Sequence, residues 1–248
     1  EGEDIVLAGA RTLTSAGNLT LDASVDGIVS DNTLTATAGL DITVNDDLTT
    51  AGDTSLVAEN SLSINGNLTT AGVTTLTADN DGNDSGDLTL AASKTIDTNE
   101  NAATLTASDI VLGGSLTTGA AALNLLVSDG GTIGLGDTDK DFDLTGAELS
   151  RITAGDVQIG DSSSSDITVD NITALNSDGM SGMLTLDATG NDASISFDTV
   201  ASFFNSLTAK ADDEIAINVD LTTDTGDMIL EGEDIVLAGA RTLTSAGN

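Results

Sequence analysis

The chain has 248 residues, with 41 Asp and Glu against 6 Lys and Arg, four Phe, and no His, Cys, Pro, Trp or Tyr. Its formal charge of −35 repels phosphate backbones and anionic lipid surfaces, and no apolar run approaches about 18 residues, so nucleic acid partners and membrane insertion are excluded. Without Cys and His there are no disulfides, zinc sites, thiolate nucleophiles or Ser/His/Asp triads, while a hydrophobic content of 39% indicates a folded chain rather than an acidic disordered one.

The first segment of the chain returns later in the sequence. Residues 1–18, EGEDIVLAGARTLTSAGN, recur unchanged at 231–248, which gives a period of 230 residues. We interpret 1–230 as one full repeat unit of a continuous structure and 231–248 as the start of the next identical copy. Because the chain starts at Glu1 without Met or a signal peptide, we interpret it as a fragment or a processed product. The expected partners are further copies of the repeat, joined end to end in one chain or filament, with lateral bundling as an additional contact.

Short segments of alternating character follow one another along the chain. In each, two apolar residues flank a single residue, which is the period-2 pattern of a strand with one buried face. Gly, Asn, Asp and Ser interrupt these segments every few residues, and Asn65-Gly66 and Asp81-Gly82 predict tight turns. The predicted strands lie at 19–21, 42–44, 62–64, 88–90, 110–112, 133–135, 167–169, 184–186 and 195–197.

The spacing of related segments predicts how these strands are arranged. The sequence LTTAG at 48–52 returns at 68–72, 20 residues later. Short strands in coils of about 20 residues are typical of a parallel β-solenoid, in which each coil buries its apolar side chains by stacking on its neighbours. The rival arrangement, a string of β-sandwich modules, needs longer strands and usually a core Trp or Tyr. We therefore predict an all-β, right-handed parallel β-helix (β-solenoid) that repeats end to end.

Two acidic stretches are candidate calcium loops. Alternating oxygen-bearing side chains around a Gly resemble the start of a calcium-binding loop, but both stretches lack the distal Glu of an EF-hand. The alternative for each is a solvated loop that protrudes from a coil. The candidate ligands are Asp79, Asp81, Asn83 and Asp84 in the first stretch, and Asp137, Asp139 and Asp141 in the second.

A resemblance to a known family is carried by residues 144–173, LTGAELSRITAGDVQIGDSSSSDITVDNIT, and by phrases such as NLTTAG at 67–72. These segments resemble large bacterial exoproteins of the filamentous haemagglutinin type, which are adhesin-like proteins with tandem β-helical repeats. The resemblance implies a right-handed parallel β-helix, secretion, an extracellular or cell-surface location, and a role in a surface structure or fibre. It transfers no binding residues, because those repeats carry no fixed site.

The segment 198–210, DTVASFFNSLTAK, departs from the strand pattern because its apolar residues recur at helical spacing. One interpretation is a short helix or loop on the solenoid surface, with Phe203 and Phe204 in contact with a neighbouring filament. The other is an irregular coil whose aromatic side chains fill the interior.

The residues also bear on two further functions, glycoside hydrolysis and ice binding. The carboxylate pairs Asp46-Asp47 and Asp212-Asp213 are the residue type that glycoside hydrolysis uses, but adjacent residues of a strand point to opposite faces, and aromatic sugar platforms are lacking. Thr-Leu-Thr triplets at 12–14, 33–35, 75–77 and 104–106 would point paired hydroxyls outward, as an ice-binding solenoid requires. Their uneven spacing predicts a broken array.

These features predict a non-enzymatic structural repeat segment of a secreted bacterial surface fibre, stalk or sheath. One period carries a charge of −33, because residues 1–18 contribute −2 to the total, so the predicted form is a stiff and highly anionic rod. No cofactor is required, and calcium enters only if the acidic loops bind it. The alternatives are a calcium-dependent adhesin repeat, an ice-binding solenoid, or a β-helical polysaccharide-degrading enzyme.

Overall fold

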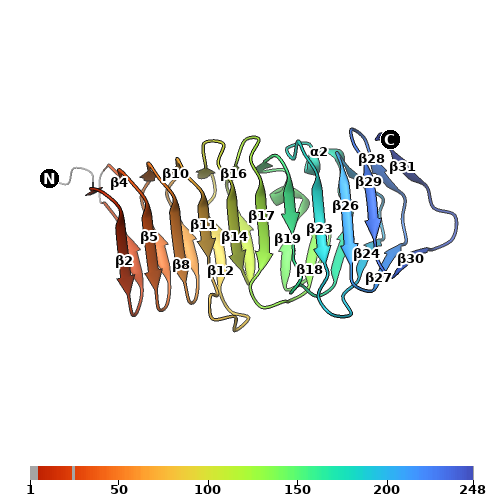
Figure 1. Ribbon diagram of the computed structural model, residues 1–248, viewed down its shortest axis with the longest axis horizontal. Helices are drawn as coiled ribbons and strands as arrows, with labels where there is room; N and C mark the ends of the chain where they lie inside the picture. Colours follow the sequence, from red (N-terminus) through yellow and green to blue (C-terminus); the bar gives the residue numbers. More distant parts are fainter. Residues whose placement is uncertain (1–4, 24–25, 248) are drawn as a thin grey trace. The chain divides into compact units, whose positions relative to one another are not determined.

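The computed structural model describes residues 5–23 and 26–247. The chain divides into two compact units, Glu1–Leu123 and Asn124–Asn248. Each unit is built from stacked coils of about 22 residues whose strands are all parallel (Figure 1). The predicted parallel β-solenoid is therefore confirmed.

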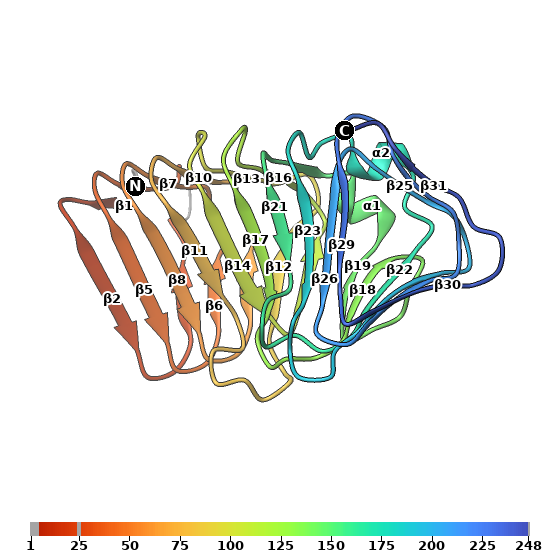
Figure 2. The ribbon, with the colours of Figure 1, turned by 45° about the vertical axis from the view of Figure 1, so that its right-hand side comes forward.

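The first unit places the strands of each coil in three parallel sheets, here called sheets I, II and III (Figure 2). Sheet I contains β1 (Ile5–Leu7), β4 (Ile28–Ser30), β7 (Leu48–Thr50), β10 (Leu68–Thr70), β13 (Thr95–Asp97) and β16 (Ser115–Thr117). Sheet II contains β2 (Arg11–Ser15), β5 (Leu34–Ala38), β8 (Thr54–Ala58), β11 (Thr74–Thr77) and β14 (Ala103–Ala107). Sheet III contains β3 (Leu19–Leu21), β6 (Ile42–Val44), β9 (Leu62–Ile64), β12 (Asp87–Leu90) and β15 (Asp109–Leu112).

The second unit also has three sheets, here called sheets IV, V and VI. Sheet IV contains β21 (Val157–Ile159), β23 (Leu184–Ala188), β26 (Leu207–Ala211) and β29 (Met228–Glu231). Sheet V contains β18 (Ile133–Gly136), β19 (Phe142–Leu144), β22 (Ile167–Asp170), β24 (Ile195–Asp198), β27 (Glu214–Ile217) and β30 (Asp234–Leu237), and sheet VI contains β25 (Ser202–Phe204), β28 (Leu221–Thr223) and β31 (Leu243–Ser245). The remaining strands are β17 (Leu123–Val127) and β20 (Ile152–Thr153).

The core of each coil is formed by alternate residues of its strands. In β7, Leu48 is buried while Thr49 points outward. Leu48 stacks in register between Ile28 of the preceding coil and Leu68 of the next. Because a parallel ladder repeats this register, each apolar column is continuous from coil to coil. All nine segments predicted from period-2 alternation are strands of these sheets.

Polar side chains that enter the interior are hydrogen bonded. The hydroxyls of Thr50 and Thr54 hydrogen bond at one corner of a coil, and those of Thr70 and Thr74 do so one coil later, at 2.6 Å. Among the described residues, no buried side-chain nitrogen or oxygen lacks a hydrogen bond. Such pairing offsets the cost of burying hydroxyls at the corners.

The turns depend on close approach between coils. At Gly66, in the predicted Asn65-Gly66 turn between β9 and β10, a Cβ atom would lie 2.1 Å from the carbonyl oxygen of Asp46 in the preceding coil. Only glycine fits this contact. The Asp81-Gly82 turn is also present, with the Gly82 amide donating to the Asp79 carbonyl at 3.0 Å.

Two short helices interrupt the strands of the second unit. Helix α1 (Gly146–Leu149) has a capping box made by Thr145 and Glu148. At the start of helix α2 (Ala174–Ser177), the Thr173 amide and hydroxyl donate to the side-chain oxygen of Asn176. The Asn176 amide donates to the Gly146 carbonyl at 2.7 Å and so ties the two helices together (Figure 2). Most of the segment that carries the family resemblance, residues 144–173, is thus a helix-decorated coil of the solenoid.

The interpretation of 198–210 as a helix is wrong. The segment forms the end of β24, then β25 and most of β26. Its apolar residues alternate along strands, so Phe204 points inward and Phe203 points outward. The Phe204 ring packs edge-on against Phe197, with 6.4 Å between centroids. The alternative interpretation, in which an aromatic fills the interior, holds for Phe204.

We expect the interior columns to carry the stability of the first unit. Leu48→Ala should lower the free energy of unfolding by about 2–5 kcal/mol, because it leaves a cavity between two stacked side chains. The matched variant Thr49→Ala, on the outward face of the same strand, should cost less than about 1 kcal/mol. Urea unfolding followed by circular dichroism measures both, and equal losses would contradict the stacking described here.

Candidate functional site

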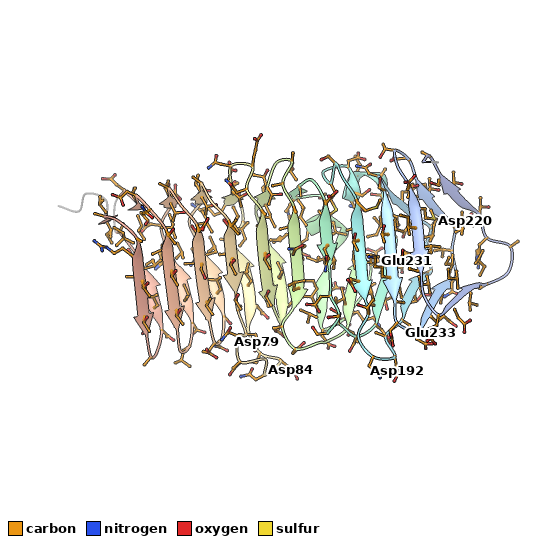
Figure 3. All side chains as sticks on the ribbon, viewed as in Figure 1. Asp79, Asp84, Asp192, Asp220, Glu231 and Glu233 are labelled. Carbon is orange, nitrogen blue, oxygen red and sulfur yellow. The ribbon has the colours of Figure 1, made fainter. Side chains whose placement is uncertain are left out.

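The first candidate calcium loop lies between β11 and β12, where Figure 3 labels Asp79 and Asp84. Asp79 is buried, and its carboxylate accepts a hydrogen bond from the Asn83 amide nitrogen at 3.1 Å. The Asn83 side-chain nitrogen donates to the Asp81 carboxylate at 2.9 Å. Asp79, Gly82 and Asp84 have positive φ angles of 51°, 61° and 63°, so the loop turns sharply on itself. The loop's own amides therefore bind two of its carboxylates.

The second candidate loop directs its carboxylates to different partners. Asp137 accepts from the Asn171 side chain at 2.7 Å, and Asp141 accepts from the Thr132 hydroxyl at 2.7 Å. Asp139 is exposed. Across residues 5–23 and 26–247, no three His, Cys, Asp or Glu side chains are grouped closely enough to hold a metal ion.

Two carboxyls of this second loop region have pKa values shifted in opposite directions. Hydrogen bonds from the Thr132 hydroxyl and amide lower the pKa of Asp141. Burial raises the pKa of Asp143, and the nearby carboxylates of Glu148 and Asp139 raise it further, against the lowering effect of the Thr138 hydroxyl. The charge on Asp141 thus favours the fold, whereas the charge on Asp143 opposes it.

The carboxylate pairs considered for sugar hydrolysis serve the turns between coils. Asp46 accepts from the Ala23 amide of the preceding coil at 2.7 Å, whereas Asp47 accepts from the Asn67 amide of the following coil at 2.8 Å. These two carboxylates therefore reach in opposite directions along the stack. In the other pair, Asp212 accepts from the Asp192 amide at 3.0 Å.

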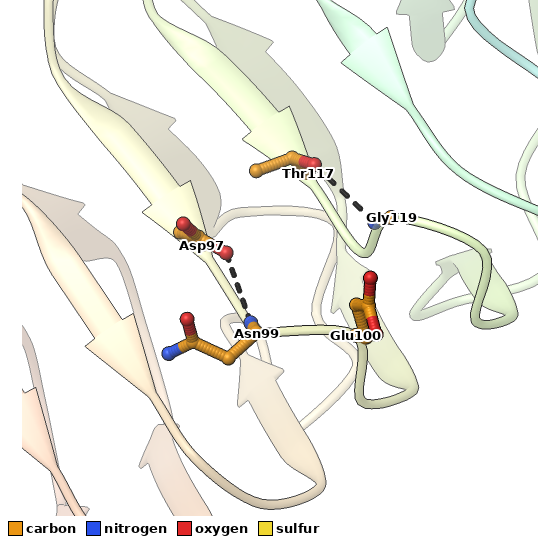
Figure 4. Close-up of a pocket in the computed structure, with 5 residues that line it drawn as sticks. All are labelled: Asp97, Asn99, Glu100, Thr117 and Gly119. Carbon is orange, nitrogen blue, oxygen red and sulfur yellow. Dashed lines mark hydrogen bonds between the residues drawn. The ribbon is translucent and has the colours of Figure 1, made fainter.

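A shallow polar depression of about 460 Å³ lies in the first unit, at the turns that follow β13 and β16 (Figure 4). It is lined by Asp97, Asn99, Glu100, Thr117 and Gly119. The Asp97 carboxylate accepts from the Asn99 amide at 2.9 Å, and the Thr117 hydroxyl accepts from the Gly119 amide at 3.3 Å. Sequence reasoning missed this depression because its residues lie in two coils, 20 residues apart, and form no motif within either coil. The carboxylate and hydroxyl groups that face it are the ordinary caps of the two turns.

The two Phe residues predicted for interaction have different environments. Phe203 is 41% exposed and lies on the outward face of β25. Phe204 is 1% exposed, so it cannot contact another filament, and that part of the prediction is wrong. Strand alternation, rather than helical spacing, would have identified which ring points outward.

The last coil of the second unit leaves its interior columns uncovered. Ile235 and Leu237 of β30 stack in register on Ile215 and Ile217, yet they are 45% and 44% exposed where their partners are fully buried. Leu243 of β31 is likewise 39% exposed above Leu221. These side chains point into the solenoid interior, and no described residue covers them on the other side.

The first coil is open in the same way. Ile5 of β1 pairs with Ile28 and is 40% exposed, whereas Ile28 is 1% exposed. The two copies of the repeated segment therefore direct corresponding side chains, Ile5 and Ile235, toward the interior. They differ in their second strand, which has five residues in β2 and three in β31.

Comparison with known proteins identifies no relative: no family model matches the chain, and neither a curated protein nor a solved structure matches it significantly. The helices of the described residues are too short and too polar to cross a membrane.

The opposite pKa shifts predict opposite responses to removing charge. Asp143→Asn should raise the melting temperature at neutral pH by roughly 1–3 °C, because the cost of a buried charge is removed. That gain should disappear as the pH falls below the ordinary aspartate range, where Asp143 is already protonated. Asp141→Asn should lower the melting temperature at neutral pH, and this loss should vanish as the pH falls through the lowered pKa of Asp141. Thermal melts across this range test both signs, and equal responses of the two variants would refute the assignment.

We expect divalent cations to act by screening charge rather than at the acidic loops. Calcium and magnesium at equal concentration should raise the melting temperature by the same amount over a chelator control. A calcium-specific rise that saturates, and that is lost in Asp81→Asn or Asp137→Asn, would instead establish a calcium loop.

Proposed function

We propose that this chain is a structural repeat segment of a secreted bacterial surface fibre, stalk or sheath, without enzymatic activity. The observation that carries the proposal is the stacking of parallel coils in register, which continues each inward column from one coil to the next. In the last described coil, Ile235, Leu237 and Leu243 extend the columns of Ile215, Ile217 and Leu221. A further coil of the same kind would continue these columns.

The energetic gain of adding a coil supports this partner. Covering the exposed half of each inward aliphatic side chain contributes about 1 kcal/mol. The ladder of β30 also gains the backbone hydrogen bonds that β27 already makes on both sides. Several such contributions act together on one coil, so end-to-end growth is favoured over leaving the coil in water.

The repeated sequence supplies a partner of this kind. Residues 231–248 copy residues 1–18, and Ile5 and Ile235 both face the interior. A further copy of the chain would thus continue the alternation of inward and outward side chains. The resemblance of residues 144–173 to filamentous haemagglutinin-type exoproteins supports the extracellular location within the same proposal.

The charge of the chain supports a fibre whose sides repel one another. The total is −35, because 41 Asp and Glu stand against 6 Lys and Arg, and Lys210 pairs with Glu231 at 4.0 Å. Because its acidic groups are not neutralised by bases, the outer surface is strongly anionic and keeps the stack soluble. Lateral bundling would then require salt or divalent cations.

A tandem protein tests this function. Residues 1–230 joined directly to residues 1–248 should give small-angle X-ray scattering with an unchanged cross-sectional radius and a length increased by one period. A thicker or collapsed particle would refute end-to-end stacking.

The junction of that tandem protein provides the matched variants. Ile235→Asp places a charge in the interior column at the joint, so it should produce two segments that bend about a flexible joint and melt separately. Val236→Asp changes the neighbouring outward residue of the same strand and should leave the scattering unchanged. Equal behaviour of the two variants would contradict a continuous interior at the joint.

A further inference from the structure

Two columns of side chains, nine of the ten bearing a hydroxyl, cover the outward face of sheet II, whose strands Figure 1 shows side by side. Each strand has two outward positions, two residues apart. The parallel register stacks the first of these positions into one column and the second into another. The first column is Thr12, Thr35, Ser55, Thr75 and Thr104, and the second is Thr14, Thr37, Val57, Thr77 and Thr106. Sheets I and III have mainly three-residue strands, so each presents one outward position per coil in most of its strands.

The uneven spacing of the Thr-Leu-Thr triplets does not break this array, which corrects the expectation from sequence. The extra residues between β11 and β14 are accommodated mainly in the acidic loop at 79–86, outside the sheet. Of the triplet at 33–35, only Thr35 belongs to the array, because Thr12 aligns with Thr35 and Thr14 aligns with Thr37. Strand β8, which lies between β5 and β11, contributes Ser55 and Val57 to the two columns and contains no Thr-Leu-Thr triplet.

Four central threonines of this face do not use their hydroxyls to hold the fold together. Within the described part of the chain, the side chains of Thr35, Thr37, Thr75 and Thr77 make no hydrogen bond, and all four are partly exposed. The inward threonines of the same sheet behave differently, since Thr74 bonds to Thr70 at 2.6 Å. The outward hydroxyls of these four residues are thus left to bond to water, each with one donor and two acceptor sites.

The face is uncharged although the chain is strongly acidic. Neither column contains Asp, Glu, Lys or Arg, whereas 19% of all residues are charged. In the second unit, the long strands of sheet IV carry Asp187, Lys210 and Glu231 at outward positions. Outward positions on long strands of this protein can therefore carry charged side chains.

The geometry of a parallel sheet fixes the spacing of these hydroxyls in two directions. Neighbouring strands lie about 4.8 Å apart, and alternate residues of one strand lie about 6.6 Å apart. Each Thr adds a methyl group beside its hydroxyl, so the face combines hydrogen-bonding and apolar points in a regular net. A rigid, uncharged net of this kind fits a ligand that is itself a periodic array of hydrogen-bonding groups, and crystalline water is such a ligand.

We propose that the outward face of β2, β5, β8, β11 and β14 binds the surface of ice. Hydroxyls of the two columns hydrogen bond to water molecules of one crystal plane, while the methyl groups and Val57 occupy the gaps between them. Bound chains stop growth of that plane and lower the freezing temperature below the melting temperature. This activity does not depend on the chain being part of a fibre.

Thermal hysteresis of the 248-residue chain tests the inference, together with the shape of single ice crystals grown in its presence. We expect hysteresis and faceted crystals from the natural sequence. Thr75→Lys, in the centre of the array, should reduce the hysteresis severalfold. The control Thr89→Lys makes the same change on the outward face of β12 in sheet III and should leave the hysteresis unchanged. Val57→Thr completes the second column and should increase it.

Circular dichroism establishes that each variant is folded, and Thr37→Lys replaces Thr75→Lys if the latter is not. Round crystals and no hysteresis with the natural sequence would overturn the inference. Equal loss in the sheet II and sheet III lysine variants would overturn it as well, because the effect would then not belong to this face.

Discussion

The structure depends on in-register stacking of one coil on the next. A coil of about 22 residues has no core of its own, and its inward Leu, Ile, Val and Ala side chains are buried only because the neighbouring coils supply the other half of each column. The backbone ladder enforces this register, since a slip of one residue would turn Leu48 outward and Thr49 inward. The turns follow the same constraint, because Gly66 must let its backbone approach Asp46 in the coil below. The interior is therefore filled mostly by aliphatic side chains, and the rings of Phe197 and Phe204 pack edge-on against each other.

Much of this architecture could be predicted from the sequence because alternation is a local property. Each of the segments 42–44 and 62–64 shows it within three residues, and their spacing of 20 gives the length of a coil. Alternation fails where two apolar residues are adjacent, as at Phe203 and Phe204, because helical and strand spacing cannot be told apart over so few residues. The register of the outward columns was out of reach for another reason. It depends on how many residues each loop absorbs, which is why Thr12 aligns with Thr35 and not with Thr33.

Candidate sites were harder to predict than the fold. Acidic residues in Asp79–Asp84 have the composition of a cation loop, but composition does not show that Asn83 donates to both Asp79 and Asp81. The same amide–carboxylate contacts occur between coils, from Asn67 to Asp47 and from Asn218 to Asp198. Carboxylates of one coil are thus placed where amide groups of the next coil donate hydrogen bonds to them. At these turns Asn supplies the donor and Asp supplies the acceptor of a hydrogen bond between neighbouring coils. Which Asn meets which Asp follows only from the order in which the coils stack.

The direction of the strands has a consequence for assembly. All of them are parallel, so the first coil and the last coil of such a stack are different surfaces, and neither is complementary to itself. A contact between unlike surfaces is heterologous, and it generates an open linear polymer rather than a closed symmetric dimer. If the proposed fibre forms in this way, its two ends are unlike, and a dissimilar terminating element rather than symmetry limits its length.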